Sequence, residues 1–138
     1  KSVSNYKPLN NRSQLIKTKH NSIISDCYNA NPTSTLEALK SFINIKHVNK
    51  LAILGDMLEL GYEEDNEHQK IVNYLKNKSI KSILVGKCYK KTKNNFDCFK
   101  DTNQLIDFLN KKKYTNYFIL LKGSRGIKLE NIINQNIL

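Results

Sequence analysis

Hydrophobic positions follow two different spacings along the chain, and this difference separates the predicted strands from the predicted helices. Near the N-terminus, residues 13–18 and 22–26 flank the polar residues 19–21, a pattern that predicts a hairpin. Later segments are short apolar runs, typical of strands buried on both faces of a parallel sheet. These runs cover residues 51–54, 82–86 and 117–123, with a weaker one at residues 96–99.

Between these runs, hydrophobic residues recur every three or four positions, which predicts amphipathic helices. Acidic residues precede the second hydrophobic stripe and favour a helix N-terminus there. Asp101 or Thr102 is the expected N-cap of the third helix. The first helix is expected over residues 32–46, and the others are marked by His68, Ile71, Val72 and Leu75, by Leu105, Ile106 and Leu109, and by Leu129, Ile132 and Ile133.

Strands therefore alternate with helices along the chain. This order predicts an α/β fold: a Rossmann-like, mainly parallel sheet flanked by helices, with an antiparallel hairpin at the N-terminal edge. At 138 residues the chain has the length of one domain and buries enough surface to fold without a metal or a disulfide. We therefore expect residues 1–138 to form a single domain, whose polar start suggests the end of a linker from an upstream segment.

Cysteine usage and hydropathy indicate the compartment. The three cysteines, Cys27, Cys88 and Cys98, are widely spaced and form no C-x-x-C pair, which suits a reducing cytosol. No apolar run approaches the roughly 20 residues of a membrane span, and the first residues lack the hydrophobic region of a signal peptide. We expect a soluble, cytoplasmic protein.

The net charge of +11 raises the question of a polyanionic partner. The basic residues are scattered, and Lys dominates so strongly that Arg12 and Arg125 are the two arginines of the chain. The sequence also lacks the basic and aromatic platform of RNA-binding sheets. A solvated lysine surface is therefore favoured, with no nucleic acid and no membrane as partners. The densest cluster, residues 111–114, is expected at a helix C-terminus, where cations are favourable.

Polar, glycine-bearing segments follow several of the predicted strands. They cover residues 26–31, 55–61, 86–89 and 122–126. Because ligands of open parallel sheets bind at the carboxyl ends of the strands, we expect these loops to share one edge and to converge on one ligand.

Each loop also has an explanation that needs no ligand. Asn31 before Pro32 is a competent helix N-cap with a proline at the first helical position. Asp26 is able to close a turn, and Tyr28 to fill core volume. His68 fits its hydrophobic stripe, so a packed or capping histidine is favoured over a ligand.

The segment from Gly123 to Gly126 has the chemistry of an anion site. Its backbone N–H groups, the Ser124 hydroxyl and the Arg125 guanidinium are expected at a helix N-terminus, where a carboxylate or a phosphate binds well. Other motifs are missing: there is no phosphate loop, no G-x-G-x-x-G, no H-E-x-x-H, no G-x-S-x-G and no paired cysteine and histidine ligands. The chain alone therefore predicts no metal site and no triphosphate cradle.

Three segments together resemble the C-terminal domain of the Mur ligases. They are "DCYNANPTS" at residues 26–34, "LGDMLELG" at residues 54–61 and "LKGSRG" at residues 121–126, in the same order and with similar spacing. In addition, "NNRSQLI" at residues 10–16 resembles the arginine-bearing entry to that domain. Within the family, the likeness is greatest to the members that join D-Ala-D-Ala to UDP-N-acetylmuramoyl-tripeptide, and it covers nearly the whole chain.

The sequence departs from the family pattern in two ways. Thr35 and Ile127 stand where methionine is expected, and both are changes of packing. The UDP-sugar domain and the central ATPase domain of the family are absent from this chain. The resemblance therefore implies a lid domain that closes over ATP and Mg held mainly by the central domain. It also implies a monomeric enzyme and an isolated 138-residue domain without activity.

The resemblance also assigns site residues. None is catalytic and none binds a metal, so the implied contacts are with the nucleotide and with the incoming dipeptide. The implied nucleotide-binding residues are Arg12, Asp26, Asn29 and Asn31, and the implied substrate-binding residues are Asp56, Lys122, Ser124 and Arg125.

Two other readings remain open at this point. The chain is also compatible with the C-terminal domain of another Mur-type ligase or of a folylpolyglutamate synthase, although "YNANP" together with "KGSR" favours the D-Ala-D-Ala enzymes. A basic nucleic-acid-binding module is the second alternative, and it predicts strongly salt-dependent binding to oligonucleotides.

Overall fold

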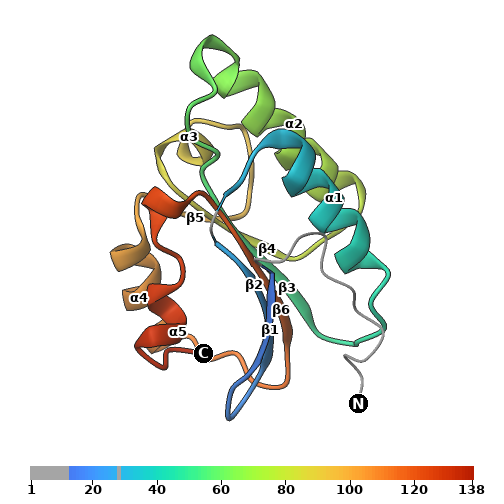
Figure 1. Cartoon of the computed structure of the whole chain (residues 1–138), viewed down its shortest axis with the longest axis vertical. Coiled ribbons are helices and arrows are strands. Elements are labelled where there is room, and N and C mark those ends of the chain that lie inside the picture. The colour runs from blue at the N-terminus through green and yellow to red at the C-terminus, as the bar shows by residue number, and fades with distance from the viewer. Residues whose placement is uncertain (1–12, 28) are drawn as a thin grey trace.

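The computed structural model describes residues 13–27 and 29–138. Within these residues, six strands form one sheet in the order β1-β2-β6-β3-β4-β5 (Figure 1). The strands are β1 Gln14–Lys17, β2 Ser22–Asp26, β3 Lys50–Gly55, β4 Ser82–Val85, β5 Asp97–Phe99 and β6 Phe118–Lys122. The α-helices are α1 Pro32–Ile43, α2 Glu64–Asn77, α3 Lys87–Lys90, α4 Thr102–Lys111 and α5 Asn131–Asn134, with short 3-10 helices at η1 Gly61–Glu63 and η2 Arg125–Ile127.

The sheet is parallel apart from its first strand. β1 pairs antiparallel with β2, which confirms the predicted hairpin, and the remaining neighbours pair in parallel. β6, the last strand in the sequence, lies between β2 and β3. The predicted α/β class with a mainly parallel sheet is therefore confirmed.

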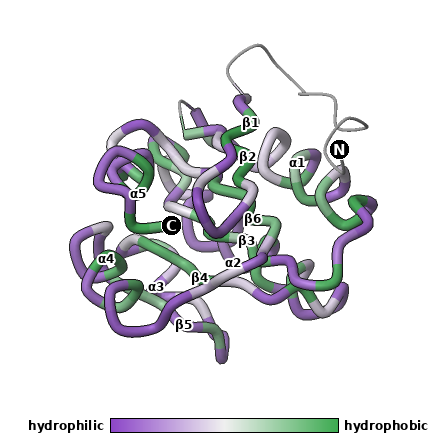
Figure 2. Tube along the Cα trace, turned by 90° about the horizontal axis from the view of Figure 1, so that it is seen from below, coloured by the Kyte–Doolittle hydropathy of each residue, from purple (hydrophilic) through white to green (hydrophobic). Residues whose placement is uncertain are grey.

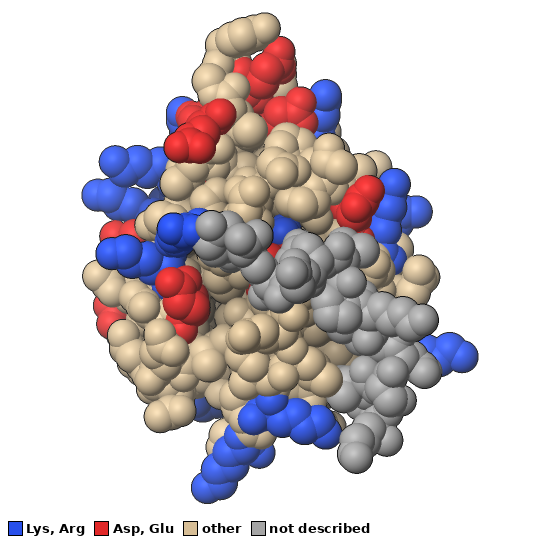
Figure 3. Space-filling model, viewed as in Figure 1, with Lys and Arg blue, Asp and Glu red and all other residues tan. Residues whose placement is uncertain are grey.

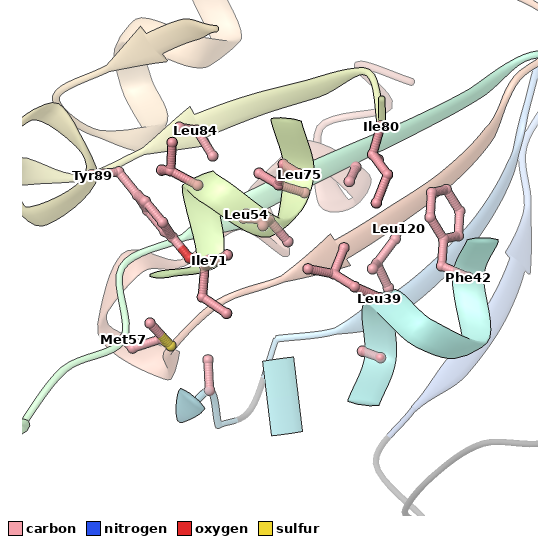
Figure 4. Packing of buried hydrophobic residues seen from close by; sticks show 14 of the residues in the cluster. Leu39, Phe42, Leu54, Met57, Ile71, Leu75, Ile80, Leu84, Tyr89 and Leu120 are labelled. Carbon is pink, nitrogen blue, oxygen red and sulfur yellow. The ribbon is translucent and has the colours of Figure 1, made fainter. Parts of the chain in front are cut away.

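Helices cover both faces of the sheet, which explains why the inner strands are apolar at nearly every position. α1 and α2 pack on one face, where Leu39, Phe42 and Leu75 meet Leu54 and Leu120 (Figures 1 and 4). α4 and α5 pack on the opposite face. Successive strand residues alternate between the two cores, so both faces of the sheet are buried.

Helix α1 begins as predicted and ends earlier than predicted. Asn31 is its N-cap, as predicted, and also forms a capping box with Ser34. The predicted end at residue 46 is wrong, because the helix stops at Ile43. There the Lys50 ammonium donates to the carbonyl oxygens of Phe42 and Ile43 in the last turn and to that of Ile45 just beyond it.

The helices differ from the sequence analysis in two further ways. A helix was not expected after β4, yet α3 forms there over four residues. The predicted helix opening at Gly123–Gly126 is wrong, because that segment leads into the 3-10 helix η2, which ends at Lys128 in a left-handed conformation with φ of 63°. The final α-helix starts later and also spans four residues.

Among the described residues, the large hydrophobic side chains that are exposed are Leu15, Val48, Leu58 and Tyr62. Hydrophilic residues dominate the connecting segments around the sheet in Figure 2, whereas the strands are mostly hydrophobic. On the face shown in Figure 3, lysine and arginine side chains are spread around the outline of the molecule. Within the described ranges, no helix has both the length and the apolar character that crossing a membrane requires.

Candidate functional site

The predicted gathering of the polar loops at one edge of the sheet is confirmed. β2, β6, β3 and β4 are adjacent and parallel, so their carboxyl ends share one edge of the sheet (Figure 1). The loops after β3 and β6 approach so closely that a Cβ atom at Gly123 would lie 3.0 Å from the Gly55 Cα. Small residues at both positions allow this approach.

At the ends of β2 and β6, Asp26 and Lys122 form a buried ion pair. The two residues are register partners, and the Lys122 Nζ lies 2.8 Å from the Asp26 Oδ2. The Ser13 hydroxyl donates to the same carboxylate oxygen. The Lys122 ammonium also donates to the main-chain oxygen of Asn29 at 3.0 Å. Since Lys122 is 1% exposed, the structure places this side chain inside the protein and not in contact with the solvent that a dipeptide would displace.

The predicted nucleotide residues occupy different settings on the loop between β2 and α1. Asn29 is exposed. Asn31 is also exposed, but its Oδ1 accepts the Ser34 N–H at 2.8 Å and is used by the helix cap. Arg12 and Tyr28 lie outside the described residues. Among the described residues of this loop, Asn29 therefore has the side chain best placed to meet a ligand.

Asp56, after β3, is committed to a structural contact. Its carboxylate accepts the N–H groups of Cys88 and Tyr89 at 2.9 and 3.0 Å, and its residue is 3% exposed. It thus caps the short helix α3 from a distant part of the chain. Gly86 has a φ of 124°, and a Cβ atom there would overlap the Asp56 carboxylate, so glycine is required for this contact. The structure therefore does not place Asp56 with the exposed residues of the edge.

His68 is packed and hydrogen-bonded, as the sequence favours. Its Nε2 accepts the Met57 N–H at 2.9 Å, so Nδ1 carries the proton and donates to the main-chain oxygen of Glu64 at 2.7 Å. These two bonds require the neutral imidazole. The ring also meets the Tyr89 ring edge to face, at 4.6 Å between centroids.

Asp56, His68 and Cys88 form the one group of possible metal ligands found in the part of the chain that the structure describes, with ligand atoms within 4.8 Å of one another. The group does not fit a metal ion. The carboxylate and the imidazole nitrogen already accept backbone hydrogen bonds. Burial, followed by the charge of Asp56, raises the pKa of the Cys88 thiol to about 12, whereas metals bind the thiolate. The sequence prediction that no residue binds a metal stays a prediction.

The loop after β6 is tied to its neighbours through Ser124. The Ser124 hydroxyl accepts the Leu58 N–H at 3.0 Å, and the Ser124 N–H donates to the main-chain oxygen of Asp56 at 3.2 Å. Ser124 is buried, whereas Arg125 next to it is exposed. Because η2 has three residues and not the several turns of an α-helix, a strong helix dipole does not support the predicted anion site.

Sequence reasoning missed the contacts that hold this edge together. Ser13 supports Asp26, and Lys122 and Ser124 bind the neighbouring loops. The sequence contains no local signal for these partners, because each bond joins segments that are far apart along the chain.

Comparison with known proteins shows the protein family to which the chain belongs. Residues 11–125 match the family described as "Mur ligase, glutamate ligase domain", and the chain therefore belongs to this family. The resemblance seen in the three sequence motifs is thereby confirmed.

Individual relatives are more specific. The chain is 37% identical to the UDP-N-acetylmuramoyl-tripeptide--D-alanyl-D-alanine ligase of Buchnera aphidicola subsp. Baizongia pistaciae, over 94% of this chain and 29% of the relative. It is 31% identical to the ligase of the same name from Rickettsia prowazekii, over 89% of this chain and 29% of the relative. The chain thus spans under one third of the length of these curated relatives.

Solved structures agree in fold. The chain is similar to crystal structure I of MurF from Acinetobacter baumannii, with a TM-score of 0.77, 22% identity and coverage of 98% of this chain and 31% of that one. It is also similar to MurF ligase from Thermotoga maritima, solved in complex with ADP, with a TM-score of 0.76, 18% identity and coverage of 98% and 32%. At these identities the likeness establishes the fold alone.

Proposed function

We propose that this chain is the C-terminal domain of an ATP-dependent ligase that joins D-Ala-D-Ala to UDP-N-acetylmuramoyl-tripeptide in peptidoglycan synthesis. The observation that carries the proposal is that relatives of 31% and 37% identity bear this activity in their names and match about nine tenths of the chain. The rest of the enzyme would consist of a UDP-sugar domain and a central ATPase domain. The proposed enzyme is a cytoplasmic monomer.

In the proposed reaction, ATP phosphorylates the terminal carboxylate of the tripeptide. The amine of D-Ala-D-Ala then attacks the acyl phosphate, so that an amide bond forms and phosphate leaves. The central domain would hold Mg and the triphosphate. The described residues suit this division of work, because Asp26 and Asp56 are buried and accept hydrogen bonds from protein donors, whereas Mg²⁺ sites use accessible carboxylates, waters and substrate phosphates.

The loop after β2 is the proposed nucleotide side of this domain. Asn29 is exposed on it and offers an amide that is able to donate and accept hydrogen bonds. Asp26 supports the start of this loop through Lys122, and Asn31 fixes its end through the cap of α1. Arg12 is proposed as a further nucleotide contact, because a guanidinium matches phosphate geometry.

The loop after β6 is the proposed dipeptide side. Arg125 is exposed there and has a fork of donors that matches a carboxylate in two parallel hydrogen bonds. Ser124 holds the loop in place through Leu58. We propose that Arg125 binds the C-terminal carboxylate of D-Ala-D-Ala and leaves the amine free to react.

The acceptor preference of the full-length protein tests the proposed function. Purified protein is supplied with ATP, Mg and UDP-N-acetylmuramoyl-tripeptide, and phosphate release is measured with D-Ala-D-Ala, D-Ala, D-glutamate or diaminopimelate as acceptor. We expect turnover with D-Ala-D-Ala. Turnover with a different amino acid alone would assign the chain to another ligase of the family.

The role of Arg125 is tested with the substrate as well as with the protein. Arg125→Lys should raise KM for D-Ala-D-Ala about tenfold, equal to about 1.4 kcal/mol, because lysine cannot form the paired bonds. With the native enzyme, D-Ala-D-Ala amidated at its C-terminus should lose kcat/KM by a similar factor. If the native enzyme uses the amidated and the free dipeptide equally well, the carboxylate role is wrong.

A further inference from the structure

Lys122 lies in the middle of the carboxyl edge, yet its ammonium group is inside the protein. The side chain is 1% exposed, and its Nζ donates to the Asp26 Oδ2 at 2.8 Å. A dipeptide could reach this group only by separating a buried ion pair, which leaves a buried carboxylate without compensation. Direct binding of the substrate by Lys122 is therefore physically costly.

The second hydrogen bond of the Lys122 ammonium connects the sheet to a loop. Its Nζ donates at 3.0 Å to the main-chain oxygen of Asn29, which belongs to the loop after β2 and not to the sheet. That loop is also held at its two ends, by Asp26 in the last position of β2 and by the capping box of Asn31, and the Ser124 hydroxyl donates to the main-chain oxygen of Ala30 at 3.5 Å. Lys122 thus holds the loop at an intermediate point, at Asn29, which is exposed.

We infer that Lys122 is a positioning residue for the nucleotide: through the Asn29 carbonyl it fixes the loop so that the Asn29 side chain meets the nucleotide. The inference rests on the proposed function for the nucleotide side of the domain, and it removes Lys122 from the residues that bind the dipeptide. A charge-assisted bond suits this task, because it is stronger than a bond between neutral groups.

The test is Lys122→Met in the full-length ligase, with two readouts. The dissociation constant for ADP is measured by calorimetric titration, and KM is measured for D-Ala-D-Ala. We expect the dissociation constant for ADP to rise about tenfold and KM for the dipeptide to rise less. The titration needs no acceptor substrate, so it tests the inference independently of the proposed ligase activity.

Lys50→Met is the matched control. Lys50 also donates its ammonium protons to main-chain oxygens, but it lies at the start of β3, at the opposite edge of the sheet. This variant should lose thermal stability without any change in ADP affinity. If both variants leave ADP affinity unchanged, the role of Lys122 is structural only. If KM for the dipeptide rises while ADP affinity does not, Lys122 is a dipeptide ligand, and the inference is overturned.

A second pair of variants covers the case in which the unpaired Asp26 prevents folding. Asp26→Asn alone is compared with Asp26→Asn combined with Lys122→Met, so that any direct part of Asp26 in binding is common to both. The combined variant should bind ADP more weakly than Asp26→Asn alone, because it also loses the bond to Asn29. Equal affinities of the two would overturn the inference.

Discussion

The cap of α3 allows a sharp test of how this edge is held. Asp56 accepts two backbone N–H groups of α3 inside the protein. Asp101 performs the same task for α4, where it accepts the Gln104 N–H at 2.9 Å, but it is exposed. Replacing each aspartate by alanine removes the same side chain from two caps that differ in burial.

The structure sets the expected magnitudes. Asp56→Ala leaves the N–H groups of Cys88 and Tyr89 buried without their acceptor, and each such group costs about 1–3 kcal/mol, so the loss is about 2–6 kcal/mol. In Asp101→Ala, water replaces the lost acceptor, and the expected loss is about 1 kcal/mol. The free energy of unfolding should therefore fall clearly further in the first variant.

Urea unfolding of the 138-residue domain, followed by circular dichroism, measures both losses. With a urea dependence of about 2 kcal/mol per molar, a loss of about 3 kcal/mol lowers the midpoint by about 1.5 M. Equal midpoint shifts for the two variants would refute the argument from burial. A small shift for Asp56→Ala, together with a raised KM for D-Ala-D-Ala in the proposed full-length ligase, would restore the sequence-based role of Asp56 as a substrate contact.

Two further predictions concern stability. Gly86→Ala should destabilise the domain by more than about 2 kcal/mol, because the added Cβ atom overlaps the buried Asp56 carboxylate and φ is 124°. Gly61 has a φ of 64° and open space around the Cβ position, so Gly61→Ala should cost about 1 kcal/mol. Equal urea midpoints of the two variants would contradict this difference. Burial raises the pKa of the Cys27 thiol from 9.0 to about 11. Above pH 9 the unfolded chain therefore binds fewer protons than the folded chain, and the free energy of unfolding falls as the pH rises towards 11. Urea midpoints between pH 8 and 10.5 should fall less steeply in Cys27→Ala than in the native domain, and identical slopes would show that Cys27 does not contribute.

Periodic patterns in the sequence predict most of the elements because they act over short distances. The apolar runs at residues 51–54, 82–86 and 117–123 each coincide with a strand, and the limits differ by no more than one residue at either end. The N-cap of α1 follows from Asn31 and Pro32, since a capping side chain reaches only three residues along the chain. Elements of this kind need no information about distant parts of the molecule.

The errors occur where distant groups decide the local structure. α3 is too short to have a readable hydrophobic period, and its N–H groups are capped by Asp56, more than thirty residues earlier. α1 ends before its predicted limit because Lys50 reaches back to its last carbonyls. In both cases a side chain outside the element replaces the capping signal that sequence analysis looks for.

The sequence by itself determined the α/β class, the hairpin, the helix cap at Asn31 and the gathering of the polar loops at one edge. These features depend on burial periods, backbone preferences and the parallel direction of strands that alternate with helices. Only the tertiary structure decided how the polar residues of that edge are used. β6 lies between β2 and β3, and this order brings Lys122 against Asp26, 96 positions away in the chain. A buried charge needs a partner inside the fold, and the strand order supplies Asp26 to the buried Lys122, whereas Arg125 is exposed.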